Sequence, residues 1–280
     1  YTIFHTHPDG LIGYYRFDEN ASGSFTHDDS NNGYDGVLNG DLITGWLPTH
    51  TWSSNPALYF NPDYRGNFIT LTGPNTSSVQ DTNLYTVNGG MIEANQVATY
   101  INNSSDHSYT IASWVYPDEN TCISSNTENY IWSFSDTQGG NIGGLAYGCA
   151  GTANANKFAF GKANVTSYYS QNQYPSNQWY HVALTVDKSN SIANFYINGF
   201  NVYTFSQSSA PAILDLNDEQ HAGFFAIGQY WSGDLSNLQT SQHFSGSLNE
   251  FCVWNRNLNI KEVNYAMLGN PSQEDLVAYY

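Results

Sequence analysis

The feature that most constrains the fold of this chain is a series of short apolar runs that end at turn residues. In the run 109–116, apolar and small polar residues alternate until Pro117, as expected for a strand with one buried face. The run 193–197 leads into Asn198-Gly199, a dipeptide that strongly favours two-residue hairpin turns. Such closely spaced strands and turns are typical of a two-sheet sandwich. Strands are predicted at 11–17, 109–116, 179–186, 193–197, 202–205, 224–228 and 248–254.

One segment near the end of the chain has helical periodicity. The sequence predicts a helix over 259–268, with Asn259 as its N-cap and Gly269 as its stop. Its apolar stripe comprises Ile260, Val263, Met267 and Leu268. No linker rich in proline, glycine and serine divides the chain, which favours one domain over two.

The two ends of the chain resemble each other. Residues 10–15 (GLIGYY) are similar to residues 275–280 (DLVAYY), and the second copy follows the predicted helix. We therefore expect an N-terminal arm over 1–9, a single domain over 10–270 and a terminal segment over 271–280 that begins the next unit of a tandem array. The alternative is that both segments are edge strands of one sandwich.

The charge balance excludes several classes of protein. The net charge is -17, although only 11% of the residues are charged, so the acidity reflects a shortage of Lys and Arg. Seven basic residues are too few for the basic surface of a nucleic-acid binder. An aromatic content of 16% is too high for a disordered acidic tail. No run of 18 apolar residues is present, so no membrane-spanning helix is predicted.

Cysteines and glycosylation sequons indicate an extracellular or cell-surface location. Cys122 and Cys149 each flank a predicted strand and are expected to form a disulfide, whereas Cys252 is expected to be buried and free. Three reduced thiols are the alternative. Sequons that favour secretion occur at Asn20, Asn75, Asn102, Asn103 and Asn164.

Six segments in the same order resemble the laminin-G-like, concanavalin-A-like jelly-roll family, which also includes pentraxins. The segments are 10–19, 28–36, 109–117, 179–187, 195–199 and 244–256. The resemblance implies an all-β, two-sheet antiparallel jelly-roll sandwich with one short C-terminal helix. It also implies a module that binds glycans or proteins, or that acts as a spacer. Trp114 and Trp254 are expected to fill the space between the sheets.

Calcium is the cofactor that this resemblance suggests. In related modules a calcium ion often joins an acidic loop to a strand that here carries Asn249 in place of an acid. Hard cations prefer oxygen ligands, and the short segment 28–35 concentrates carboxylates and amides. The predicted ligands are Asp28, Asp29, Asn31, Asn32, Asp35 and Asn249. Alternatively, the segment is a turn whose side chains cap their own backbone.

The sequence carries no recognisable catalytic motif. The glucanases that this fold resembles have a Glu-x-Asp-x-Glu strand, and that spacing is absent here. His5 and His7 lie two residues apart without a third metal ligand, and His181 is expected to be a core or rim histidine. We therefore expect a protein that is not an enzyme, with a divergent glycoside hydrolase or lyase as a weaker hypothesis.

Aromatic residues in polar, loop-like contexts are the predicted contact residues. They can stack on sugars, or alternatively form subunit contacts. They are Tyr64, Tyr168, Tyr169, Tyr174, Tyr230 and Trp231. The main hypothesis is a non-catalytic extracellular module for adhesion or structural assembly, whose partners are neighbouring copies or repeats. The alternative is a calcium-dependent lectin-like module that binds extracellular glycans.

Overall fold

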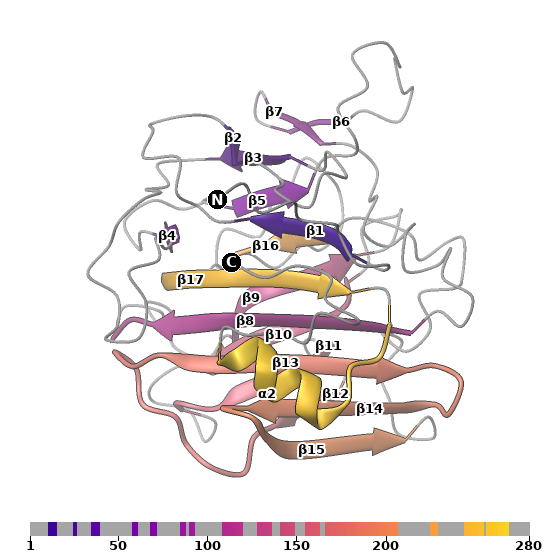
Figure 1. Ribbon diagram of the computed structural model, residues 1–280. Helices are drawn as coiled ribbons and strands as arrows, with labels where there is room; N and C mark the ends of the chain where they lie inside the picture. The colour runs from indigo at the N-terminus through magenta and orange to yellow at the C-terminus, as the bar shows by residue number, and fades with distance from the viewer. Residues whose placement is uncertain are drawn as a thin grey trace, which may run out of the picture.

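The chain folds into two antiparallel sheets that are packed face to face (Figure 1). The fold is described from a computed structural model. The described residues are 11–15, 25–26, 35–39, 58–60, 68–71, 85–87, 90–92, 108–119, 128–135, 141–148, 155–162, 166–206, 225–228, 244–254 and 256–268.

The first sheet, sheet A, has seven strands and carries the only helix among the described residues. Its strand order is β1 (Leu11–Tyr15), β17 (Gly246–Trp254), β8 (Tyr109–Pro117), β13 (Tyr180–Asp187), β14 (Ile192–Ile197) and β15 (Phe200–Ser206), with β4 (Leu58–Phe60) also paired to β17. Every pairing in this sheet is antiparallel. The segment that begins at residue 11 is thus part of the same sheet as strands from the far end of the chain.

The second sheet, sheet B, has eight strands, all in antiparallel pairs. Its order is β12 (Thr166–Tyr169), β11 (Phe158–Lys162), β10 (Asn141–Gly148), β9 (Glu128–Ser135), β16 (Phe225–Ile227), β5 (Phe68–Leu71), β3 (Gly36–Asn39) and β2 (Phe25–Thr26). A separate hairpin joins β6 (Tyr85–Val87) to β7 (Gly90–Ile92). The predicted jelly-roll sandwich is confirmed.

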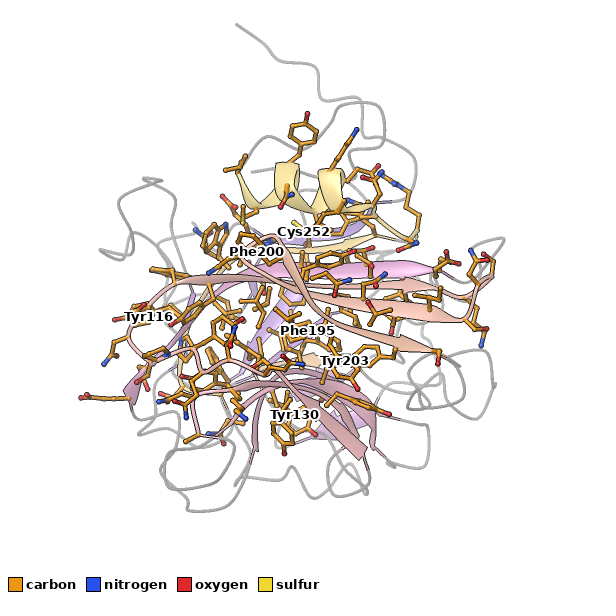
Figure 2. The ribbon with its side chains drawn as sticks, turned by 90° about the horizontal axis from the view of Figure 1, so that it is seen from below. Tyr116, Tyr130, Phe195, Phe200, Tyr203 and Cys252 are labelled. Carbon is orange, nitrogen blue, oxygen red and sulfur yellow. The ribbon has the colours of Figure 1, made fainter. Side chains whose placement is uncertain are left out.

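The main hydrophobic core lies between the two sheets. Alternate residues of β8, namely Tyr109, Ile111 and Val115, face inward and are at most 1% exposed. Phe195 and Tyr203 also point into the space between the sheets (Figure 2). Because fully burying one such side chain contributes roughly 1.5–3 kcal/mol, this layer is the main source of stability.

A second apolar cluster lies on the outer face of sheet A, beneath helix α2 (Ile260–Met267). It joins Ala112, Ala183 and Cys252 of the sheet to Val263 of the helix. Cys252 is a free, buried cysteine, as predicted, and lies between the sheet and the helix (Figure 2). Burial, and secondarily the nearby Glu250, raises the pKa of this thiol well above its usual range, which makes it unreactive.

Hydrogen bonds from the sheet fix the start of α2. The Thr110 hydroxyl donates to the backbone oxygen of Arg256 (2.9 Å) and accepts from the backbone N–H of Leu258 (3.0 Å). Asn259 is the N-cap, as predicted, and forms a reciprocal capping box with Glu262. Glu262 also forms an ion pair with Arg256 (3.0 Å). The helix therefore has a defined position on the sheet.

The turn between β13 and β14 contacts the same segment. Asp187 accepts hydrogen bonds from the Ser189 hydroxyl (2.7 Å), from the backbone N–H of Asn190 (2.9 Å) and from the Asn257 amide (3.4 Å). Desolvation alone would raise the pKa of Asp187, but these hydrogen bonds outweigh it and leave the pKa lowered. The ionised carboxylate thus links the turn to the segment before α2.

The predicted hairpin turn at Asn198-Gly199 is confirmed. Both residues have positive φ, 50° and 77°, as a type I′ turn requires. A Cβ atom at position 199 would collide with the Asn264 side chain of α2. Glycine is therefore needed here for backbone conformation and for the close approach of the hairpin to the helix.

Two predictions about packing are wrong. Trp254 is buried, but it lies in the cluster under α2, and Trp114 is half-buried on the outer face of sheet A. Neither residue fills the space between the sheets, because strand alternation places both on the opposite face from Ile111. The predicted helix stripe is also only partly buried: Val263 is covered, whereas Ile260 and Leu268 are 42% and 65% exposed.

Several predictions concern residues outside the described part of the chain. They include the N-terminal arm 1–9, the segment 271–280, the cysteines Cys122 and Cys149, and the sequons at Asn20, Asn75, Asn102, Asn103 and Asn164. In the described part, no helix is long and apolar enough to cross a membrane.

The anchoring of α2 predicts the effect of Thr110→Val. This change keeps the volume but leaves a buried backbone N–H without its partner, so we expect the free energy of unfolding to fall by about 1–3 kcal/mol. Urea denaturation would measure the change. Thr204→Val removes a hydroxyl of β15 whose hydrogen bonds, to Asn194 and Asn201, are solvent-exposed, and it should cost no more than about 0.5 kcal/mol. Equal effects of the two substitutions would show that Thr110 does not anchor the helix.

Candidate functional site

The outer face of sheet A carries two rows of large polar and aromatic side chains beside α2. The first row crosses β17, β8 and β13 at residues that pair directly in the sheet, whereas the second joins paired residues of β17 and β8 to the residue that precedes β13. The first row consists of Asn249, Trp114 and His181, and the second consists of Ser247, Tyr116 and Trp179. We call these six residues the aromatic rows.

The first row centres on Trp114. Its ring packs edge to face with His181, with centroids 5.5 Å apart and planes at 65°. Trp114 is half-buried, whereas His181 and Asn249 on either side are each only 2% exposed. The backbone N–H of His181 donates to the side-chain oxygen of Asn198 (2.9 Å), so the hairpin turn holds this end of the row.

The second row contains a pair of partly exposed aromatic rings. Tyr116 and Trp179 pack with centroids 5.4 Å apart and planes at 51°. Ser247 is 7% exposed and pairs with Tyr116 from the other side. Figure 2 shows Tyr116 on sheet A, away from the part that α2 covers above Cys252. Tyr116, packed against Trp179, thus presents aromatic surface on a part of sheet A that the helix does not cover.

Residue size explains this arrangement. The next row toward α2 contains Cys252, Ala112 and Ala183, whose small side chains let the helix approach the sheet. Along β8, the outward-facing residues change from the small Ala112, in the helix seat, to the large Trp114 and Tyr116, which do not belong to the cluster beneath α2. The sequence of one strand therefore determines both the helix seat and the aromatic surface.

Two buried nitrogen atoms in the first row have no hydrogen-bond partner. They are Nδ1 of His181 and Nδ2 of Asn249, on opposite sides of Trp114. An unpaired buried polar group costs roughly 1–3 kcal/mol, so such groups are uncommon and often mark functional positions. Burial lowers the pKa of His181 to about 3, which keeps its imidazole neutral near neutral pH.

Only two of the six predicted calcium ligands lie in the described residues. Asp35 precedes β3 in sheet B, and Asn249 lies in β17 of sheet A beside Trp114. Asp28, Asp29, Asn31 and Asn32 lie outside the described part. In that part, no group of three His, Cys, Asp or Glu side chains forms a candidate metal site. The calcium site therefore stays a prediction.

The aromatic residues that were predicted as contact residues were expected in loops, and the structure does not place all of them there. Tyr168 and Tyr169 lie in strand β12 rather than in a loop, and both are half-buried. Tyr168 packs against the main core, and Tyr174 packs its ring against Phe158 (5.7 Å) and Tyr180 (5.3 Å). These contacts give Tyr168 and Tyr174 a packing role. Tyr64, Tyr230 and Trp231 lie outside the described residues, as do His5 and His7.

The sequence alone did not predict the aromatic rows as a functional site. Trp114 was expected between the sheets, and His181, expected to be a core or rim histidine, is buried. The signal lay in the alternation of β8: once Ile111 and Val115 face inward, Trp114 and Tyr116 must face outward. Which part of that outer face α2 would cover could not be predicted from the pattern.

Comparison with known families decides the assignment of this fold. Residues 88–264 match the family described as the concanavalin A-like lectin/glucanases superfamily. The chain belongs to this superfamily. The match covers the aromatic rows and most of α2, and it confirms the family resemblance in the sequence. A search of the curated proteins gives no match.

Solved structures with the superfamily's fold include enzymes and binding domains. The Trypanosoma rangeli sialidase in complex with sialic acid is 15% identical over 93% of this chain, with a TM-score of 0.56, and this chain spans 33% of it. Domain 4 of an extracellular arabinanase from Geobacillus stearothermophilus, in complex with arabinotriose, is 17% identical over 93% of this chain, with a TM-score of 0.54 and 99% of that domain covered.

A third similar structure is the binding domain of Paraclostridial Mosquitocidal Protein 1. It is 14% identical over 92% of this chain, with a TM-score of 0.55 and 52% of that chain covered. At these identities the three structures support the shared fold alone. The superfamily fold is thus used both by proteins named as enzymes and by domains named for binding, and the site itself must indicate the function.

The pKa of His181 predicts how stability depends on pH. The unfolded chain binds a proton at this histidine near its ordinary pKa of 6.5, whereas the folded protein does so only near 3. Stability should therefore fall as the pH drops through this window, by at most about 1.4 kcal/mol per pH unit from this residue. His181→Phe should remove that part of the slope, as measured by urea denaturation at several pH values.

The comparison has an internal reference above pH 7, where His181 is neutral in both the folded and the unfolded wild-type chain. In that range, the stability of the variant and that of the wild type should change with pH in parallel. Because the substitution also removes an unpaired buried nitrogen, stability at neutral pH should be unchanged or higher. Identical slopes for the variant and the wild type between about pH 6.5 and pH 4 would contradict the neutral state of His181.

Proposed function

We propose that this chain is a non-catalytic extracellular adhesion module that recognises neutral carbohydrate through the aromatic rows. The superfamily to which it belongs includes lectins by its description. Membership alone does not select a ligand, so the proposal rests on the chemistry of the six side chains on the outer face of sheet A.

The observation that carries the proposal is the combination of exposed aromatic surface with unpaired buried polar groups. Trp114, Tyr116 and Trp179 offer partly exposed rings of the kind that stack on apolar sugar faces. His181 and Asn249 hold unpaired nitrogens on either side of Trp114. Sugar hydroxyls can both donate and accept hydrogen bonds, and they can satisfy these groups.

The two nitrogen atoms are buried, so a ligand reaches them only when neighbouring side chains move. Trp114 is the half-buried residue that pairs with both, and its ring packs on that of His181. We infer that its indole shifts on binding, which opens access to His181 and Asn249 while the stacking surface of Tyr116 and Trp179 stays in place.

Charge favours a neutral ligand. A net charge of -17 repels sulfated or other polyanionic glycans over the whole surface. The aromatic rows contain no carboxylate, no lysine and no arginine, and His181 is neutral. The site therefore lacks the cations that acidic sugars require, and stacking with neutral hydrogen bonds is the available mode of recognition.

The same composition favours binding over catalysis. Hydrolysis of a glycosidic bond generally needs two carboxyl groups that flank the bond, and the aromatic rows provide none. Three described carboxylates have structural roles instead: Asp118 accepts from the Ser245 hydroxyl (2.8 Å), Asp187 caps a turn, and Glu262 caps α2. With the five predicted sequons, these features support an adhesive role outside the cell.

Substitutions in the rows should weaken glycan binding. We expect the chain to bind one or more neutral glycans on a glycan array. Tyr116→Ala and Trp114→Ala should each lower the affinity for the best of these glycans at least ~10-fold, as measured by calorimetry. His181→Phe should also weaken binding while the protein stays fully folded, which separates recognition from stability.

Tyr265→Ala is the matched control, because Tyr265 is an aromatic residue 45% exposed on α2, outside the rows. The affinity of this variant for the glycan should equal that of the wild type. If no neutral glycan binds with or without calcium, or if all three row variants bind as well as the wild type does, the proposed function is wrong.

Calcium at the segment 28–35 is a separate proposal. Carboxylate and amide oxygens there would hold the ion and stabilise the folded chain by mass action. Calcium at about 100 times its dissociation constant should raise the free energy of unfolding by about 2.7 kcal/mol, and a chelator should reverse the gain. Asp28→Asn should remove most of this effect. Magnesium is the control ion, and equal stabilisation by both ions, or by neither, would argue against a calcium site.

A further inference from the structure

A loop rich in amide side chains leads from β12 into β13 and ends at the aromatic rows. It comprises residues 170–178, with the sequence SQNQYPSNQ, and we call it the amide loop. Its amide side chains are those of Gln171, Asn172, Gln173, Asn177 and Gln178. The stretch 166–186, which contains the loop, has no lysine, arginine, aspartate or glutamate. The loop therefore offers hydrogen-bonding groups without charge.

Hydrogen bonds attach the amide loop to both sheets. At its start, the backbone N–H of Ser170 donates to a carbonyl oxygen of β11 in sheet B (2.8 Å). Near its end, the backbone N–H of Asn177 donates to the oxygen of Pro117, the last residue of β8 in sheet A (2.7 Å). The Tyr180 hydroxyl donates to the Pro175 oxygen (2.8 Å). Because these bonds already hold the loop backbone, a ligand that contacts the loop loses little affinity to ordering it.

The end of the amide loop lies beside the second aromatic row. Gln178 directly precedes Trp179, and Asn177 is bonded to the residue that follows Tyr116. Figure 1 shows β8 ending and β13 beginning at the same side of sheet A, where the loop arrives. Strand β8 extends roughly 10 Å from Trp114 to the residue that holds the loop. The rows and the loop end thus lie along one line that is longer than a single sugar ring.

The side chains of Asn177 and Gln178 have hydrogen-bonding capacity to offer a ligand. Both residues are exposed. Within the described part of the chain, the Asn177 side chain forms no hydrogen bond, and that of Gln178 only accepts one from the Tyr180 hydroxyl (3.4 Å). An amide group can both donate and accept, as sugar hydroxyls can. Asn177 has a φ of 63°, a conformation that asparagine and glycine adopt more readily than other residues.

We propose that the end of the amide loop is a second subsite next to the aromatic rows, and that the ligand is a neutral oligosaccharide rather than a single sugar. One sugar unit stacks on the rows, and a following unit exchanges hydrogen bonds with Asn177 and Gln178. The inference rests on the proposed glycan-binding function, to which it adds the length of the ligand. Because the loop amides are uncharged, the second subsite keeps the preference for neutral sugars.

A series of ligand lengths tests the second subsite. Fragments of the best array glycan, from one to four sugar units, would be titrated against the full chain by NMR. The affinity of the wild type should rise at least ~10-fold from the single unit to the longer fragments. Asn177→Gly removes the amide and tolerates the positive φ, so it should lose most of this gain and change the affinity for the single unit less than ~2-fold. Gln178→Ala should act in the same direction.

Ser191→Gly is the matched control, because Ser191 also has a positive φ (56°) and lies in the turn at the opposite end of β13. This variant should bind every fragment as the wild type does. The second subsite is refuted if the wild-type affinity does not rise with ligand length, or if Asn177→Gly and Gln178→Ala both keep the full gain. In either case, weaker binding by the Tyr116→Ala variant would leave the glycan function standing. Failure of the wild type to bind any fragment would reject the function and the subsite together.

Discussion

The pairing of β8 with β13 on one side and β17 on the other determines the outer surface of this protein. It aligns Asn249, Trp114 and His181 in one row and Cys252, Ala112 and Ala183 in another. Because side chains alternate in a strand, a slip of one residue in β8 would move Trp114 and Tyr116 into the core and expose Ile111. The apolar residues on the inner face of β8 oppose such a slip, so the main core also fixes the register of the aromatic rows.

Helix α2 depends on the same register. Its seat consists of small residues of three strands, and Thr110 of β8 fixes the segment that leads into it. A helix placed one row further along the sheet would collide with Trp114 and His181, whereas its present position covers the small side chains of Ala112, Ala183 and Cys252. The helix therefore occupies one part of the outer face, next to the part that carries the proposed binding surface.

Much of the fold could be predicted from the sequence, because strand alternation, the Asn198-Gly199 turn and the capping box at Asn259 are local signals. The strands of sheet B were harder to predict: β10 (NIGGLAYG) and β11 (FAFGK) contain glycines that weaken the strand pattern. The site was missed for a different reason. A tryptophan in a strand indicates burial, but burial under a helix, between sheets or beside a ligand gives the same pattern. Only the face of Ile111 relative to Trp114, together with the extent of α2, distinguishes these cases.

The distribution of charge connects the surfaces. The acidic residues Asp187 and Glu262 are engaged at the turn and cap near α2, while the aromatic rows and strands β14 and β15 are uncharged. Long-range repulsion from a charge of -17 disfavours non-specific contact everywhere, but it weakens short-range contact least at the uncharged surfaces. Specific recognition then depends on aromatic stacking and hydrogen bonds, which act only over short distances. The shortage of basic residues thus limits which ligands these surfaces can bind, and the unpaired nitrogens of His181 and Asn249 provide the proposed site with hydrogen-bonding groups suited to a hydroxyl-rich ligand.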